Sequence, residues 1–497
     1  MTKTILFETP LYPNPNRSLL GQWSTLRAAA LGLAMCASAA LTLSAQTVTT
    51  IHTFNGADGS SQISPLIQNT DGNFYGTTEG GGTDNSGTIF KITPQGTLTT
   101  LYSFCDAVTG CSRVPFAALV RGTDGNLYGT AAFGGSDIEC NGAVFKITPR
   151  GAFTTLYEFC SSESSGQFPE AALVQAQDGN LYGITSGTLF KISPQGQLTT
   201  IYRFCSQPSC TDGSFPTGPG LLLGADGNLY GTTSQGGAFG LGTVFRSTLA
   251  GKLTTLYSFC AQSNCPDGRG PGQIVQASDG NLYGTSVEGG STGNECNDPT
   301  GCGTAFKLTL GGKLTTLYTF CYVLFCKDGY TPNSLVVGSD GNLYGTTRFG
   351  GILGGNYGDG TIFRLTPDGT FTSLYAFCTQ AHCPDGAWPT SLVQSTDGTF
   401  YGATNSSNGT IFKLDVGLPP FLKTMPRFGK VGASVIILGN RLSSATTISI
   451  NGTAATFTVL SNNEIKATVP AGATTGQLTV TTAQGTLASD VVFTVVP

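Results

Sequence analysis

Residues 71–104 read DGNFYGTTEGGGTDNSGTIFKITPQGTLTTLYSF, and the same succession of short strings returns along most of the chain. The string Asp-Gly-Asn-(Leu/Phe)-Tyr-Gly occurs six times, and Asp397-Gly-Thr-Phe-Tyr-Gly402 is a degraded seventh copy. The first residues of these copies are Asp71, Asp124, Asp178, Asp226, Asp279, Asp340 and Asp397. Internal repetition at a period of roughly 50 residues is typical of repeat folds, and it indicates the fold class more strongly than any single motif.

Each repeat unit holds four short β-like runs. We name them run A (an apolar segment such as Ala118–Val120), run B (Asn-Leu-Tyr-Gly-Thr), run C (Gly-Thr-Val-Phe-Lys) and run D (Leu-Thr-Thr-Leu-Tyr-Ser-Phe). Asp-Gly separates runs A and B, and Pro-x-Gly separates runs C and D, so both links have the composition of tight turns. Four antiparallel strands per unit, repeated seven times, predict an all-β fold, a seven-bladed β-propeller over residues 46–414.

The two ends of the array predict how the propeller closes. Run D occurs first, at Val48–Phe54, before any other run, while the last unit ends with run C at Gly409–Leu414 and has no run D. We therefore expect Val48–Phe54 to pair with Gly409–Leu414, which would remove both exposed sheet edges. The alternative is an open β-solenoid, in which this offset would serve no purpose.

The repeat strings resemble the GloVer tandem-repeat family over residues 48–414. This resemblance implies a secreted bacterial protein of a group with varied C-terminal anchors, and it implies no particular activity. The chain departs from the family pattern because no apolar segment followed by arginines is evident at its C-terminus.

The N-terminal 45 residues have the composition of a secretory signal peptide. Lys3, Arg17 and Arg27 precede the apolar run AAALGLAMCASAALTLSA at residues 28–45, which ends in small residues. The alternative is an uncleaved membrane anchor, because eighteen residues is just long enough to span a bilayer. We expect cleavage, a secreted or cell-surface location and no membrane span afterwards.

The sequence changes character after Leu414. Residues 415–420 predict a linker, and residues 421–497 contain short β-rich runs separated by Gly, Asn and Pro, which predict a β-sandwich. The strings Gly429–Gly432, Val435–Gly439, Asn451-Gly452 and Val469–Gly472 resemble an IPT/TIG immunoglobulin-like domain.

Composition excludes several classes of function. The net charge is −5 and charged residues are 11 % of the chain, with no Lys/Arg cluster, which argues against nucleic acid as a partner. Histidine occurs only at His52 and His382, which argues against a His-rich metal site and a Ser-His-Asp triad. We expect no cofactor, no metal, no catalytic residue and a monomer.

Fourteen cysteines remain once Cys36 in the leader is set aside. An even number in an exported chain predicts disulfides. Six pairs are close in sequence, and Cys140 and Cys160 are left to pair because their loops should emerge on one face. The predicted pairs are Cys105–Cys111, Cys140–Cys160, Cys205–Cys210, Cys260–Cys265, Cys296–Cys302, Cys321–Cys326 and Cys378–Cys383. Metal binding is the alternative, but zinc needs four ligands gathered in one place.

The loops that follow run D hold the candidate ligand-binding residues. Several read Cys-x-Asp-Gly-x-x-Pro, with aromatic residues just before the proline. Aromatic faces and carboxylates on a rigid rim could bind sugars by stacking and by hydrogen bonds to hydroxyls. The candidates are Asp212, Asp267, Asp328, Asp385, Phe168, Phe215, Tyr330 and Trp388. The alternative is that Asp-Gly only forms turns and that the aromatic rings fill gaps between blades.

These features predict an extracellular, non-catalytic scaffold that binds a glycan or a protein through the disulfide-rich face. The alternative is an extracellular hydrolase or lyase with an acidic site in the central channel, acting with or without calcium, since paired carboxylates alone suffice for some hydrolyses.

Overall fold

The computed structural model describes residues 46–104, 114–134, 140–160, 166–216, 220–290, 301–351, 358–406 and 408–496. The predicted signal peptide lies outside these residues, as do Cys105, Cys111 and Cys296. Regular structure in the described ranges consists of β-strands and three single-turn 3₁₀ helices, η3 (Pro208–Cys210), η4 (Leu324–Cys326) and η5 (Leu442–Ser444). None of the helices found there has the length and apolar character that crossing a membrane requires.

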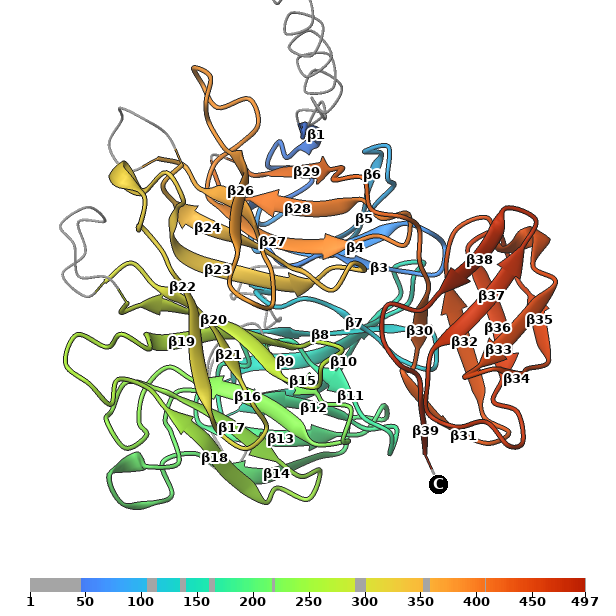
Figure 1. Ribbon diagram of the computed structural model, residues 1–497, viewed down its shortest axis with the longest axis horizontal. Coiled ribbons are helices and arrows are strands. Elements are labelled where there is room, and N and C mark those ends of the chain that lie inside the picture. The colour runs from blue at the N-terminus through green and yellow to red at the C-terminus, as the bar shows by residue number, and fades with distance from the viewer. Residues whose placement is uncertain are drawn as a thin grey trace, which may run out of the picture. The chain divides into compact units, whose positions relative to one another are not determined.

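The described repeat units form seven antiparallel sheets (Figure 1). The first sheet holds β2 (Ser60–Ile63), β3 (Ile67–Gln68), β4 (Phe74–Gly80), β5 (Thr88–Ile92) and β6 (Leu98–Ser103). The second holds β7 (Val120–Arg121), β8 (Leu127–Ala131), β9 (Cys140–Ile147) and β10 (Phe153–Cys160), and the third holds β11 (Val174–Gln175), β12 (Leu181–Ile184), β13 (Thr188–Ile192) and β14 (Leu198–Arg203). The fourth holds β15 (Leu222–Leu223), β16 (Leu229–Thr233), β17 (Thr243–Ser247) and β18 (Leu253–Ser258). The fifth holds β19 (Arg269–Gln276), β20 (Leu282–Glu288), β21 (Thr304–Leu308) and β22 (Leu314–Thr319), and the sixth holds β23 (Tyr330–Val337), β24 (Leu343–Phe349), β25 (Thr361–Leu365) and β26 (Phe371–Ala376).

The last repeat sheet draws its strands from both ends of the array. It holds β27 (Pro389–Gln394), β28 (Phe400–Thr404) and β29 (Thr410–Leu414), and its fourth strand is β1 (Val48–Thr53). β1 runs antiparallel to β29 with Val48 opposite Leu414, and the amide of Phe54 donates to the carbonyl of Gly409 at 3.1 Å. This is the pairing that the offset of the first run D predicts.

A Gly–Phe pair explains why the repeat strings recur so closely. In the first sheet, Gly76 on β4 lies opposite Phe90 on β5, and a Cβ at Gly76 would come 2.7 Å from Phe90 Cζ. The phenyl ring therefore covers the glycine, and no larger residue fits there. The same clash would arise at Gly129, Gly183, Gly231, Gly284, Gly345 and Gly402, each of which faces the phenylalanine of the next strand.

The Asp-Gly-Asn turns are built on one repeated hydrogen-bond set. Asp226 accepts the backbone amide of Asn228 at 3.1 Å, its side-chain amide at 2.7 Å and the hydroxyl of Tyr230 at 2.8 Å. Five other copies of the string, at Asp71, Asp124, Asp178, Asp279 and Asp340, make the same three contacts. The repeated aspartate therefore serves to form the turn, as its occurrence in every unit suggests.

The C-terminal residues form a small β-sandwich. One sheet holds β30 (Lys423–Met425), β32 (Ser434–Leu438), β36 (Glu464–Thr468) and β35 (Phe457–Val459). The other holds β34 (Thr453–Ala454), β33 (Thr447–Ile450), β37 (Leu478–Thr482) and β38 (Gly485–Ala488), while β31 (Phe428–Lys430) pairs in parallel with β39 (Thr494–Val496). Its core is mainly aliphatic, with Ile437, Ile450 and Val480 fully buried beside Phe493.

The structure adds strands that the repeat pattern does not predict. β2 pairs with β4 and gives the first sheet a fifth strand, and β30, β31 and β38 extend the sandwich. Run A, which the sequence does predict, forms strands of only two residues in some sheets, such as β7 and β11. Short strands of this kind depend on backbone pairing with a neighbour and carry no periodic signal of their own.

Candidate functional site

Two kinds of loop emerge from one end of the repeat sheets. Because neighbouring strands are antiparallel, the loop joining the second strand to the third and the loop leading from the fourth strand to the next sheet lie at the same end. The two kinds touch, since the amide of Trp388 donates to the carbonyl of Asp359 at 2.7 Å. We call this end the disulfide face, after the cysteine loops it carries, and the opposite end, with the Asp-Gly-Asn turns, the turn face.

Five disulfides lie on the disulfide face within the described residues. Four close four-residue loops, at Cys205–Cys210, Cys260–Cys265, Cys321–Cys326 and Cys378–Cys383. The fifth joins Cys140 on β9 to Cys160 on β10, which ties the two kinds of loop together. These are the pairs that the sequence predicts. The remaining two predicted pairs each include a cysteine outside the described residues.

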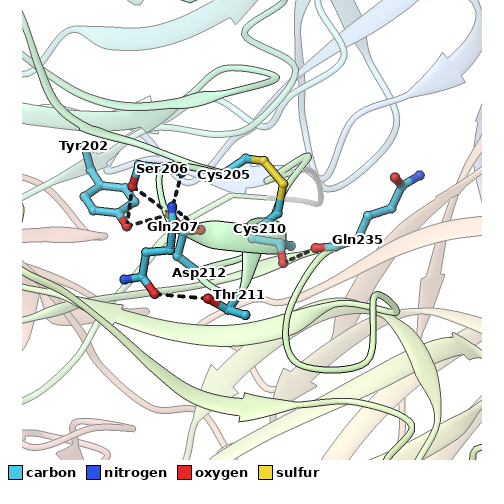
Figure 2. The surroundings of a disulfide bond; sticks show 9 residues. Tyr202, Cys205, Ser206, Gln207, Cys210, Thr211, Asp212 and Gln235 are labelled. Atoms are coloured by element: carbon cyan, nitrogen blue, oxygen red, sulfur yellow. Dashed lines mark hydrogen bonds between the residues drawn. A yellow bond between two sulfur atoms is a disulfide. The ribbon is translucent and has the colours of Figure 1, made fainter.

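The aspartate of each Cys-x-Asp-Gly loop is an internal hydrogen-bond acceptor. Asp212 is fully buried and accepts the hydroxyl of Tyr202 at 2.7 Å, the hydroxyl and amide of Ser206 at 2.9 and 3.0 Å, and the amide of Gln207 at 3.3 Å (Figure 2). Burial alone would raise the pKa of Asp212, but these hydrogen bonds outweigh burial and lower it. The carboxylate fixes the start of the disulfide loop to the strand before it.

The same arrangement recurs in the next three loops. Asp267, Asp328 and Asp385 accept the hydroxyls of Tyr257, Tyr318 and Tyr375 at 2.7–2.8 Å, and each also accepts one or two loop amides. Asp328 is 2 % exposed, and burial raises its pKa despite its hydrogen bonds. The prediction that these four aspartates offer carboxylates to a ligand is therefore corrected for Asp212 and Asp328, which lie inside the protein.

The four predicted aromatic residues do not share one surface. Phe215 and Trp388 are 51 % and 37 % exposed, but Tyr330 is only 7 % exposed and stacks on Phe349 with ring centroids 5.3 Å apart. Phe168 is half-buried against Phe133. Tyr330 is therefore corrected to a core residue, because it begins the inner strand β23 and does not belong to the loop before it.

Sequence reasoning missed the most exposed aromatic residues of the disulfide face. Tyr322 is 81 % exposed, Phe325 61 % and Val323 42 %, all within the Cys321–Cys326 loop, and Phe239 on another loop is 50 % exposed. The sequence between the paired cysteines could have indicated this exposed apolar loop. The four-residue loops read SQPS, AQSN, YVLF and TQAH in chain order, so one of the four is entirely apolar.

Cysteines and carboxylates gather at two places on the disulfide face. Two groups of potential metal ligands occur there, Cys140 with Glu158 and Cys160, and Asp359 with Cys378 and Cys383. Both contain two sulfurs that are bonded to each other, and a disulfide sulfur is not the thiolate that a metal requires. The disulfide face is instead a surface of stabilised loops with apolar side chains on its outside.

Comparison with known proteins identifies both parts of the chain. The family model described as Gloeobacter/Verrucomicrobia repeat matches residues 39–187, 185–322 and 220–436, and the model of the IPT/TIG domain matches residues 423–495. No curated protein matches this sequence.

Three solved structures illustrate what the chain is similar to. A streptogramin B lyase is 16 % identical with a TM-score of 0.49, over 74 % of this chain and 97 % of the lyase. A protein of unknown function from Bacteroides thetaiotaomicron is 16 % identical with a TM-score of 0.42, over 75 % and 76 % of the two chains. A gluconolactonase from Xanthomonas campestris is 12 % identical with a TM-score of 0.37, over 76 % and 92 %.

Proposed function

The chain belongs to the Gloeobacter/Verrucomicrobia repeat family and carries an IPT/TIG domain, and we propose that it is an exported, non-catalytic protein that binds another protein through its disulfide face. The proposal takes the repeat sheets as seven blades of a closed propeller. The pairing of β1 with β29 and the side-by-side inner strands β15, β19, β23 and β27 support that arrangement. Export is supported by the disulfides, which persist in oxidising compartments.

One observation carries the proposed function. Every large hydrophobic residue that is exposed in the described repeat sheets and their loops lies on the disulfide face. These residues are Phe215, Phe239, Tyr322, Val323, Phe325 and Trp388. Exposed apolar side chains on loops held by a stiff scaffold mark interaction sites.

A protein partner fits this surface better than a glycan does. Sugar recognition combines aromatic stacking with carboxylates or amides that bind hydroxyls, but Asp212 and Asp328 are buried and already hold tyrosine and backbone donors. The Cys321–Cys326 loop offers Tyr322, Val323 and Phe325, an apolar set of the kind that forms the centre of protein interfaces. The disulfide holds this loop in place before binding, so less conformational entropy is lost on association.

The test compares the apolar loop with an equally exposed apolar residue elsewhere. Wild-type protein, a Tyr322→Ser/Phe325→Ser variant and a Val431→Ser variant are immobilised and exposed to the secreted proteins of the source culture. Val431 is 52 % exposed in the sandwich domain and serves as the control. Bound proteins are identified by mass spectrometry, and their affinities are then measured with purified partner.

We expect a partner that binds wild type and Val431→Ser equally and the double variant at least about tenfold more weakly. A partner that binds all three equally would contradict the assignment to this loop. If wild type binds a sugar on a glycan array and the double variant does not, the ligand of this loop is a glycan and the proposal of a protein partner is wrong.

A further inference from the structure

A cavity of about 930 Å³ lies at the turn-face end of the inner strands. Its walls come from all seven repeat sheets, and the segments 421–428 and 490–496 of the sandwich domain border it. The walls are more apolar than polar, with Leu119, Val174, Leu222, Val336 and Val393 among the aliphatic residues. A volume of this size is within the range of small-molecule sites, about 300–1,000 Å³.

One repeated position in the cavity wall carries glutamine in four sheets and a different residue in the other three. Three residues before the turn aspartate, four sheets carry a glutamine, and each bonds to the turn of the preceding sheet. Gln175, for example, accepts the amide of Thr123 at 2.8 Å and donates to the carbonyl of Gly179 at 2.9 Å. The second sheet has Arg121 at this position, the only cation among the seven equivalents, which are Gln68, Arg121, Gln175, Leu223, Gln276, Val337 and Gln394.

Arg121 does not make the bonds that the glutamines make. Its Nε is buried and has no hydrogen-bond partner in the described part of the chain, and its Nη1 reaches only the sulfur of Met425, at 4.0 Å. Burial lowers the pKa of Arg121, although Glu464, Asp124 and Asp71 raise it in part. A guanidinium carries five donors suited to a carboxylate. Because Nε is buried and Arg121 lines the cavity, its terminal Nη groups are the donors that it can offer there.

A second cation borders the cavity. Lys423 on β30 donates to the carbonyl of Gln394 and adds positive charge. The carboxylates in the lining are already engaged: Asp226 holds Asn228 and Tyr230, and Asp490 accepts the amide of Val491.

We propose that this cavity binds a small organic anion with an apolar body, such as a medium-chain carboxylate. Its carboxylate accepts from Arg121, and its hydrocarbon part lies on the aliphatic walls. The guanidinium of Arg121 gains from such a ligand, because the described structure offers it no oxygen acceptor. The proposal concerns the turn face and is independent of partner binding at the disulfide face.

The test uses octanoate as probe and 1-octanol as its uncharged counterpart, with binding to the full exported protein measured by isothermal titration calorimetry. Arg121→Gln is the central variant, since glutamine occupies the same position in four other sheets and therefore fits the fold. Arg348→Gln, which removes an exposed arginine elsewhere, is the matched control. Leu222→Trp fills the cavity and serves as the second variant.

We expect octanoate to bind wild type and Arg348→Gln alike and Arg121→Gln at least about tenfold more weakly, with octanol unaffected by either change. Leu222→Trp should abolish binding of both probes. Three outcomes would overturn the proposal: no octanoate binding at millimolar concentration, equal binding to Arg121→Gln with an unchanged melting temperature, or octanoate binding that Leu222→Trp leaves intact.

Discussion

The two ends of the repeat sheets use the same pair of groups, an aspartate and a tyrosine hydroxyl, over different lengths of chain. On the turn face, Asp226 accepts the hydroxyl of Tyr230, four residues later, and the carboxylate is exposed. On the disulfide face, Asp212 accepts the hydroxyl of Tyr202, ten residues earlier, and is fully buried. The first arrangement fixes a turn, whereas the second encloses a whole disulfide loop.

This difference explains where the sequence is free to vary. In each turn, the aspartate bonds to the asparagine two residues later and to the tyrosine four residues later. Most positions of Asp-Gly-Asn-Leu-Tyr therefore have a defined role, and the string recurs almost unchanged. The loop aspartates and the disulfides hold the ends of a four-residue segment, whose side chains can then change without loss of the fold. The segments SQPS and YVLF occupy equivalent loops, and only the second is apolar.

The largest effect is expected from removing the buried aspartate Asp328 on the disulfide face, compared with the exposed Asp226 on the turn face. Asp328→Ala leaves the hydroxyl of Tyr318 and the amides of Tyr322 and Val323 without an acceptor in a buried site, and should lower the free energy of unfolding by about 3–4 kcal/mol. Asp226→Ala should cost only about 1 kcal/mol, because water replaces an exposed acceptor. Urea denaturation of both variants measures the difference, and equal losses would contradict the distinction between the faces.

A smaller effect is expected from removing single disulfides. Replacing both Cys140 and Cys160 with alanine opens a separation of 20 residues and should cost about 3 kcal/mol, whereas the Cys205/Cys210 pair, with a separation of 5, should cost about 2 kcal/mol. Differential scanning calorimetry of the two variants under oxidising conditions shows which disulfide contributes more to the stability of the protein. A larger loss at Cys205–Cys210 would show that the buried aspartate of that loop depends on its disulfide.

The smallest effect is expected from the titration of one turn aspartate. Burial alone would raise the pKa of Asp226, but its bonds from Asn228 and Tyr230 lower it below 3.8, so its contribution to stability is present above that pH and is lost as the pH falls. Unfolding free energies between about pH 5 and about pH 3 should decline less steeply in Asp226→Asn than in wild type. Burial raises the pKa of Asp328, so protonation of this residue stabilises the folded protein as the pH falls. Asp328→Asn removes that stabilisation, and the unfolding free energy should decline more steeply with falling pH than in wild type.

Repetition made the strands predictable, because a Gly–Phe contact such as Gly76 with Phe90 imposes the same residues in every unit. The cysteine pairs were predictable from their even number and close spacing. The exposure of individual aromatic residues was not predictable in this way. Tyr330 and Tyr322 lie within ten residues of each other, yet one begins an inner strand and the other projects from a loop. That outcome depends on left-handed loop residues such as Cys321 and Phe325, which no periodicity reveals.

Arg121 shows a second limit of pattern reading. Its departure from glutamine is visible in the aligned repeats, but its surroundings include the sandwich residues Met425 and Lys423, which belong to another part of the sequence. Only the structure brings these residues to one wall.

The pairing of β1 with β29 joins the first and last strands of the repeat array, so it can form only late in synthesis. A ribosome makes Val48–Thr53 first and Thr410–Leu414 only after the whole array, so at about 5–20 residues per second β1 waits roughly 20 to 70 seconds for its partner. Throughout that interval β1 is a strand with unsatisfied edges, exposed to pairing with other chains. Its sequence VTTIHT has only two apolar residues, Val48 and Ile51, among four polar ones, a composition that limits adhesion to neighbours while the rest of the protein is being made.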